Sequence, residues 1–267
     1  MKFKNILFSL SIMAAAAAIV VAGTTAFFSD TETSSGNTFT AGAIDLQIKN
    51  QASYSAIPSY SQDWGFKDID GELYFSFSDL KPGDWGENTV TLKVTSNDSY
   101  VCADVYGVEE ENGLVDPELE LNDTDASGEL GKDLRFVWWV DDGDNKLEDA
   151  ETILFGGPVS FFYMMGVAAA DIYAEDQLYL TLTDPTHNIF GVVGQAFPGN
   201  TEKSLGIGWC FGDMAIDYTQ NAGFTCDGTN VSNMAQTDQI KDAVLSFSAT
   251  QARNNASFTC KDSVRGN

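Results

Sequence analysis

One stretch of the sequence concentrates side chains that could bind a metal ion. It reads VWWVDDGDNKLEDAE, residues 137–151. It can be aligned with the twelve-residue loop that surrounds Ca²⁺ with oxygens from positions 1, 3, 5, 7, 9 and 12. With Glu151 as the last, bidentate ligand, the expected ligands are Asp142, Asp144, the backbone carbonyl of Lys146, Glu148 and Glu151.

Other positions of the loop agree with this alignment, with one exception. Asn145 falls at the sharp turn and tolerates a left-handed backbone, and Leu147 falls where the loop turns inward. The exception is position 1, which is Val140, although Asp141 beside it could compensate. Strands rather than helices are expected on both sides. The alternative is a solvated acidic turn, because D-D-G-D-N is itself good turn chemistry.

Residues for catalysis are scarce. The one histidine, His187, lies in the turn-like segment DPTHNIF, so the chain has no HExxH helix and no three-histidine zinc set. Nucleophile elbows and phosphate-binding glycine loops are missing from the sequence. Paired aromatic residues such as Trp138 and Trp139 could form a carbohydrate platform, but alternation places one of each pair in the core. We expect no enzymatic activity.

The composition indicates an acidic, well-cored β protein. The chain has 267 residues, with 14 Lys and Arg against 39 Asp and Glu, a formal net charge of −25. Such a surface repels nucleic acid and anionic lipid and attracts cations. The length suits one large β domain or two small ones, and no linker forces a second domain.

The N-terminal residues resemble an export signal. Lys2 and Lys4 precede an apolar run over residues 6–22, and small residues follow at the positions that a signal peptidase reads. We expect cleavage after Ala26, which leaves a mature chain from Phe27 with no stable membrane span. The alternative is an uncleaved N-terminal anchor helix. The expected domains are a signal peptide, 1–26, and one exported domain, 27–267.

The four cysteines predict two disulfides in an exported chain. No C-x-x-C spacing supports a zinc site. Cys210 and Cys226 are 16 residues apart across a hairpin-like excursion, which favours pairing them and leaves Cys102 for Cys260.

Short segments with period-2 alternation predict an all-β fold, a jelly-roll-like antiparallel sandwich with long loops. One short helix is expected around Met234–Lys241, and an acidic, exposed loop over 109–133. The apolar segment 156–175 is expected to be a buried strand or short helix, or alternatively a surface patch for a partner. The predicted strands are 38–48, 73–80, 88–96, 100–108, 134–140, 152–155, 177–184, 203–211 and 243–251.

Two motifs resemble the TasA and camelysin (CalY) family of exported proteins. The first is an export site followed by a T-F-x-x-G-x-x-D-L strand, matched by Thr38, Phe39, Gly42, Asp45 and Leu46. The second is an L-K-P-G-D turn before a strand, matched by Leu80, Lys81, Pro82, Gly83 and Asp84. The N-terminal resemblance, which contains both motifs, covers about 75 residues and is specific. The resemblance of the rest of the chain is looser.

The resemblance implies a secreted or cell-surface β-sandwich, processed by a SipW-like signal peptidase, that forms fibres or biofilm matrix. Its partners would be other copies of itself, joined by donor-strand complementation, in which one chain's N-terminal segment completes the sheet of the next. The donor would be residues 27–39, with Phe27, Phe28 and Phe39 as anchors. The alternatives are a monomeric surface module that binds calcium or glycans, and a metalloprotease like that attributed to camelysin, for which the histidines are lacking.

Overall fold

The computed structural model describes residues 44–57, 60, 62–69, 72–76, 79–106, 109–121, 128–161, 164, 178–235, 237–241 and 243–260. The chain divides into two units, Met1–Ala43 and Ile44–Asn267, and all described residues belong to the second. The predicted cleavage site at Ala26 and Phe27 and the predicted donor segment, 27–39, lie outside the described residues.

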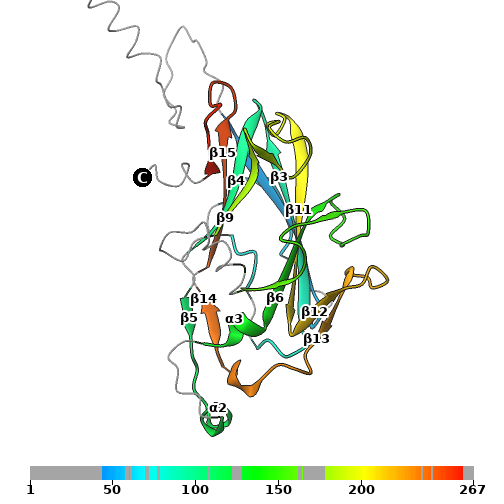
Figure 1. Cartoon of the computed structure of the whole chain (residues 1–267), viewed down its shortest axis with the longest axis vertical. Coiled ribbons are helices and arrows are strands. Elements are labelled where there is room, and N and C mark those ends of the chain that lie inside the picture. Colours follow the sequence, from blue (N-terminus) through cyan, green and yellow to red (C-terminus); the bar gives the residue numbers. More distant parts are fainter. Residues whose placement is uncertain are drawn as a thin grey trace, which may run out of the picture. The chain divides into compact units, whose positions relative to one another are not determined.

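Two antiparallel sheets form the body of the second unit (Figure 1). The seven-stranded sheet has the order β2-β1-β3-β11-β6-β7, with β8 also pairing with β6. Its strands are β1 (Leu46–Tyr54), β2 (Trp64–Lys67), β3 (Trp85–Val94), β6 (Leu134–Asp141), β7 (Thr152–Ile153), β8 (Val159–Ser160) and β11 (Thr201–Phe211).

The four-stranded sheet has the order β10-β9-β4-β15. Its strands are β4 (Ser99–Tyr106), β9 (Leu178–Asp184), β10 (His187–Asn188) and β15 (Val244–Gln251). From β3 onward, the long strands alternate between the two sheets along the chain, in the order β3, β4, β6, β9, β11 and β15. This crossing pattern is jelly-roll-like and confirms the predicted all-β sandwich.

The main core lies between the two sheets. Alternate residues of β3, such as Val90 and Leu92, point into it from one sheet, and Val101 and Leu182 do so from the other. Because these strands alternate with period 2, the opposite face of β3 presents Glu87 and Thr89 outward. The sheet therefore has a second face that other elements must cover.

Smaller elements complete the unit. Two ribbons form outside the sheets, β12 (Asp213–Ile216) with β13 (Phe224–Asp227), and β5 (Glu109–Glu111) with β14 (Gln239–Lys241). Helical segments with described bounds are α2 (Asp116–Glu120), α3 (Leu130–Asp133) and the 3₁₀ turn η2 (Asn233–Ala235). Among the described residues, no helix is long and apolar enough to cross a membrane.

Seven of the nine predicted strands correspond closely to observed ones, and two do not. In the predicted strand 38–48, pairing begins only at Leu46, and residues 38–43 lie outside the described part. The described residues of 73–80 form no strand, so that prediction is wrong. Tyr74 is buried in the core, but its carbonyl accepts from the side chain of Asn88 at 3.1 Å instead of from a neighbouring strand.

The helix and loop predictions need similar correction. In the segment expected to be helical, 234–241, the described helical part is the end of η2 at Ala235, and Gln239–Lys241 instead forms strand β14, paired with β5. The acidic segment 109–133 is not a plain exposed loop: it holds β5, α2 and α3, and Glu129 and Leu130 are buried. In the apolar segment 156–175, the described residues Phe161 and Met164 belong to the core, as expected.

The L-K-P-G-D motif forms the turn that leads into β3. Asp84 closes it, because its Oδ2 accepts from the backbone N–H of Lys81 at 2.9 Å and its own N–H donates to the Lys81 carbonyl. Gly83 has a φ of +92°, which a residue with a Cβ rarely adopts.

Candidate functional site

The predicted metal-binding loop, residues 140–151, overlaps the end of β6 and leads to β7, and Asp141, the last residue of β6, anchors it. Asp141 is buried, and its Oδ2 accepts hydrogen bonds from Thr89 Oγ1 at 3.0 Å and Trp139 Nε1 at 3.1 Å. Its Oδ1 accepts from the backbone N–H of Gly143. Asp141, and with it the start of the loop, is therefore fixed to β3 and β6.

The backbone of the loop follows the shape expected from its sequence. Asn145 has a φ of +64°, which confirms the left-handed turn predicted there. Leu147 is fully buried, which confirms that it points inward. It packs with Val137, Trp139 and Phe224 in a second, smaller core on the outer face of the seven-stranded sheet.

Three carboxylates converge at the two ends of the loop. One oxygen each of Asp141, Asp142 and Glu151 lie within 4.8 Å of one another. Glu151 closes the loop, since its two oxygens accept from the backbone N–H groups of Asp142 at 3.0 Å and Glu148 at 2.9 Å. Of the predicted ligands, the structure thus unites Asp142 and Glu151, and it adds Asp141.

The other predicted ligands lie outside this three-residue cluster. Asp144 is exposed, and Glu148 forms an ion pair with Lys146 at 3.4 Å. Their role as calcium ligands, and that of the Lys146 carbonyl, remains a prediction.

Electrostatics disfavour the charged form of these acids. Burial raises the pKa of Glu151 to about 6, although its hydrogen bonds from the Glu148 and Asp142 N–H groups oppose the shift. Burial also raises the pKa of Asp141, and the charge of Asp144 adds to it. The pKa of Asp144 is raised by burial and then by the charges of Asp142 and Glu148. A bound cation would relieve these penalties.

Glu87, on the outer face of β3, is a buried acid that sequence reasoning missed. Only 5 % of it is exposed, Oε2 accepts from Ser53 Oγ at 3.4 Å, and Oε1 has no hydrogen-bond partner. Burial raises its pKa to about 8. A glutamate inside the strand pattern WGENTVTLKV could have signalled a special position, because charged residues are rarely fully buried.

Glycine in β11 lets the outer layer lie close to the sheet. The ring of Trp139 packs over Gly206, where a Cβ would come within 2.5 Å of three indole carbons. Phe224 of β13 packs over Gly208 in the same way. The indole of Trp139 can therefore lie flat enough for its N–H to reach Asp141.

Both predicted disulfides are confirmed. Cys210–Cys226 joins β11 to β13, and so ties the β12–β13 ribbon to the sheet beside the loop. Cys102–Cys260 joins β4 to the segment after β15. Among the residues that the structure describes, no cysteine is free.

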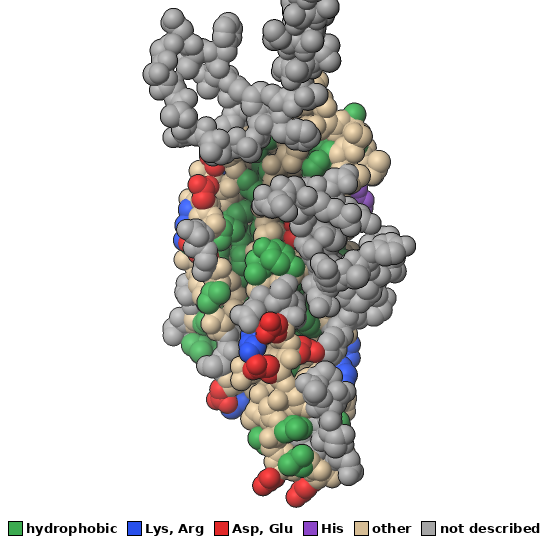
Figure 2. All heavy atoms as spheres, turned by 90° about the vertical axis from the view of Figure 1, so that its left-hand side faces the viewer, with side chains coloured by type: hydrophobic (Ala, Val, Ile, Leu, Met, Phe, Trp, Pro, Cys, Tyr) green, Lys and Arg blue, Asp and Glu red, His purple; other side chains and the backbone are tan. Residues whose placement is uncertain are grey.

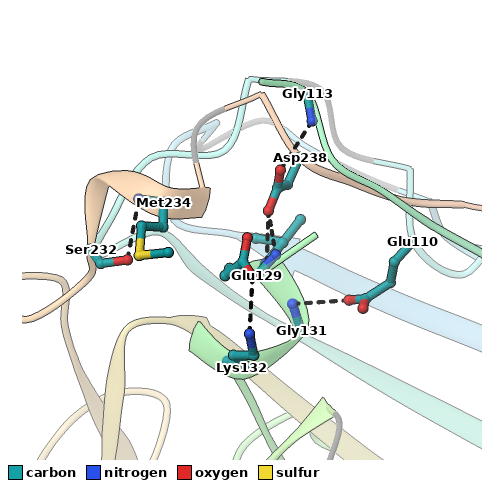
Figure 3. A network of polar contacts seen from close by, with 9 residues as sticks. Glu110, Gly113, Glu129, Gly131, Lys132, Ser232, Met234 and Asp238 are labelled. Atoms are coloured by element: carbon teal, nitrogen blue, oxygen red, sulfur yellow. Dashed lines mark hydrogen bonds and ion pairs between the residues drawn. The ribbon is translucent and has the colours of Figure 1, made fainter. Parts of the chain in front are cut away.

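A second acidic network has a structural role (Figure 3). The Asp238 carboxylate accepts from the N–H groups of Gly113, Glu129 and Leu130, and so holds the start of α3. Glu110 Oε1 accepts from the N–H of Gly131 at 3.2 Å. These acids use backbone N–H groups as partners, which attaches the β5–β14 ribbon to α3.

The edges of the sheets differ in length and character. β15 is eight residues long, pairs only with β4 among the described strands, and reads VLSFSATQ, without charge or proline. The other edge strands are shorter: β2 has four residues, and β10 and β7 have two each. His187 lies exposed on β10, far in sequence from the acidic loop.

Comparison with known proteins concerns the N-terminal part of the chain. A family model described as camelysin metallo-endopeptidase matches residues 3–56. Of these residues, the structure describes 44–56, which include all of β1. No curated protein matches the chain. The match covers about a fifth of the sequence and includes the T-F-x-x-G-x-x-D-L motif. Over residues 3–56, the resemblance to the TasA and camelysin family is confirmed.

Proposed function

We propose that this protein is a non-enzymatic structural subunit that is exported to the cell surface and assembles into extracellular fibres by strand addition. The N-terminal family match supports the export and the general class. The observation that carries the proposal is the long, uncharged edge strand β15.

β15 lacks the features by which proteins usually protect an edge. Natural edge strands are short, or they carry lysine, proline or a bulge, because an open edge offers unpaired N–H and C=O groups to another chain. β2 fits that rule, with four residues and Lys67. β15 does not, since its eight residues pair regularly with β4 from Val244 to Gln251.

Apolar side chains beside this edge could receive a partner. Leu245, Phe247 and Ala249 of β15 pack against the main core but remain half-buried. Figure 2, which faces the side where β15 lies in Figure 1, shows hydrophobic side chains at the surface there, between acidic ones. An added strand would cover these side chains and satisfy the backbone of the edge.

The donor in this proposal is residues 27–39 of a second copy. This segment is long enough to pair along all of β15 and offers Phe27, Phe28 and Phe39 as apolar anchors. Main-chain hydrogen bonds would supply affinity, and the alternating side chains would set the register.

A proteolytic role has less support, despite the description of the family model. A zinc peptidase site needs imidazole or thiolate ligands, and the chain holds one histidine and four paired cysteines. A monomeric cation-binding module is the second candidate, favoured by the convergence of Asp141, Asp142 and Glu151.

Electron microscopy of the chain beginning at Phe27 tests the proposal. We expect fibres, and we expect none when residues 27–39 are deleted. Ala249→Lys should also prevent fibres, because it places an inward-pointing charge on the β15 edge. Gly65→Lys on β2 is the matched control and should assemble normally, since a side chain there meets nothing within 4 Å. Monodisperse monomers from the unaltered chain would refute the proposal, and chelator-sensitive proteolysis would favour the peptidase.

A further inference from the structure

The loop between β10 and β11 exposes apolar side chains in a strongly acidic protein. Residues 189–200, which we call the uncharged loop, contain no Asp, Glu, Lys, Arg or His, although the whole chain has a formal net charge of −25. Among the described large hydrophobic side chains, Val192 and Val193 are the most exposed, at 63 % and 67 %. Exposed apolar residues that adjoin one another mark a candidate contact surface.

The backbone holds these two valines at the tip of the uncharged loop. The N–H of Gln195 donates to the carbonyl of Val192 at 3.0 Å, which closes a turn. The side-chain amide of Asn188 donates to the carbonyl of Gln195 at 2.8 Å. Beyond the turn, Phe197 is buried and pairs with Ser99 at the start of β4. The valines are therefore presented to solvent by a turn that is anchored on both sides.

α2 and its flanks carry a second exposed apolar surface. Leu114, Leu119 and Leu121, which we call the α2 leucines, are 48 %, 52 % and 50 % exposed. They lie within residues 109–125, which contain eight acidic residues and no lysine or arginine. Figure 2 shows hydrophobic side chains next to acidic ones at the lower end, where Figure 1 places α2. This surface is apolar with a negative surround.

The two surfaces lie at opposite ends of the sandwich. β4 runs from one to the other: its first residue, Ser99, pairs with Phe197 beside the uncharged loop, and its last, Tyr106, leads towards β5 and α2. Eight extended residues span about 26 Å. A single copy therefore cannot bring its own valines onto its own α2 leucines.

β1 begins at the same end as the uncharged loop. Its first residue, Leu46, pairs with Val94, whose carbonyl accepts from the N–H of Asn200 at 2.7 Å. The proposed donor segment, 27–39, is joined to β1 by residues 40–45, which span at most about 20 Å. A copy that lends this segment must therefore bring its uncharged loop close to the receiving copy.

The direction of strand addition decides which end of the receiving copy is met. β15 begins at Val244, opposite Tyr106 at the α2 end, and it finishes at Gln251, opposite Ser99. The long strands β1, β3, β4, β6, β9, β11 and β15 all pair antiparallel to their neighbours. An added strand of the same sense would place Phe39 beside Val244. The uncharged loop of the lending copy would then meet the α2 end of the receiving copy.

We infer that the uncharged loop of one copy docks on the α2 leucines of the next, as a head-to-tail contact along the fibre. This inference rests on the proposed strand addition, which brings the two ends together. Val192 and Val193 cover apolar surface without adding charge, whereas two acidic α2 ends would repel each other. Because the two contact surfaces differ, the contact can repeat from copy to copy into an open fibre.

The contact is too small to hold two copies together by itself. Five apolar side chains form a patch well below the roughly 1,200 Å² that stable interfaces bury. Once a donor strand is paired, however, the ends are held at a high effective concentration, and a weak contact adds to the first. Its loss should therefore weaken assembly instead of abolishing it.

Cross-linking between copies tests the head-to-tail arrangement. Chains that begin at Phe27 and carry either Val193→Cys or Leu119→Cys are assembled together and treated with a short bismaleimide. We expect cross-linked dimers from the mixture and none from either variant assembled alone. Gly65→Cys on β2, in place of Val193→Cys, is the control and should give none with Leu119→Cys.

The critical concentration for assembly gives an independent measure. Val193→Asp should raise it about tenfold, because it removes an apolar contact and sets a charge against the acidic end. Its Tm should be unchanged, since the side chain is exposed. Gly65→Asp adds the same charge on β2, where a Cβ meets nothing within 4 Å, and should leave the critical concentration unchanged.

Two kinds of failure can be told apart. If the unaltered chain forms fibres but the mixture gives no cross-linked dimers, or Val193→Asp assembles as readily as Gly65→Asp, the end contact is wrong and strand addition stands. If the unaltered chain stays monomeric, strand addition fails and the end contact fails with it.

Discussion

Gly206→Ala tests whether the outer layer depends on the close contact between Trp139 and β11. The new methyl group would lie within 2.5 Å of three carbons of the indole ring, and Trp139 is fully buried. The ring cannot shift freely, because its N–H donates to the buried carboxylate of Asp141. The substitution must therefore move the indole, the β11 backbone or both.

The expected loss of stability follows from three contributions. Overpacking a well-filled core costs about 1–3 kcal/mol. Weakening a hydrogen bond to a charged acceptor costs about 1.5–3 kcal/mol when it is fully lost. Alanine also lowers the conformational entropy of the unfolded chain, which stabilises the folded state by about 0.4–1 kcal/mol. We expect a net destabilisation of about 3 kcal/mol, which for a domain of this size lowers the Tm by about 6–12 °C.

Calorimetry of Gly206→Ala beside Gly65→Ala measures this effect. A Cβ at Gly65 meets nothing within 4 Å, so the control should change stability by no more than about 0.5 kcal/mol. In a double-mutant cycle, Gly206→Ala should cost little once Trp139→Ala has removed the ring. If Gly206→Ala is as stable as Gly65→Ala, the close contact between the Trp139 ring and Gly206 of β11 would be contradicted.

Two further predictions concern the disulfides and pH. Replacing Cys102 and Cys260 by serine should lower the free energy of unfolding by about 5 kcal/mol, and replacing Cys210 and Cys226 by about 3 kcal/mol, because the closed loops span 158 and 16 residues. Urea denaturation measures both losses, and equal losses would contradict this ranking. For pH, burial raises the pKa of Glu110 from 4.5 to about 7, so the folded chain binds the proton more tightly and stability falls as pH rises through that interval. Its partial exposure limits the contribution to about 1 kcal/mol. Glu110→Gln should reduce this pH dependence and Glu109→Gln, at an exposed neighbour, should not; the reverse would refute the assignment.

The sequence predicted features that depend on local pattern. Alternating strands, the turn at Asn145 and the inward Leu147 are all set by neighbouring residues, and the structure bears them out. The strand predicted at 73–80 failed because alternation reports burial, and Tyr74 is buried without a strand partner.

Features that depend on contacts between distant segments could not be predicted in this way. Thr89 reaches Asp141 only because β3, β11 and β6 lie side by side, although 52 residues separate the two in the sequence. Likewise, Gln239–Lys241 became a strand because β5, about 130 residues earlier in the chain, pairs with it. Such pairings are fixed by the topology of the whole sheet.

The central claim is that a segment of a second copy pairs with β15. Hydrogen–deuterium exchange tests this most directly, by comparing assembled chains that begin at Phe27 with the variant lacking residues 27–39. Strand addition should slow exchange along Val244–Gln251 in the assembled chains and leave β2 unchanged, because an added strand gives the β15 edge new backbone hydrogen bonds. Equal exchange of β15 in the two samples, or new protection confined to β2, would contradict the account.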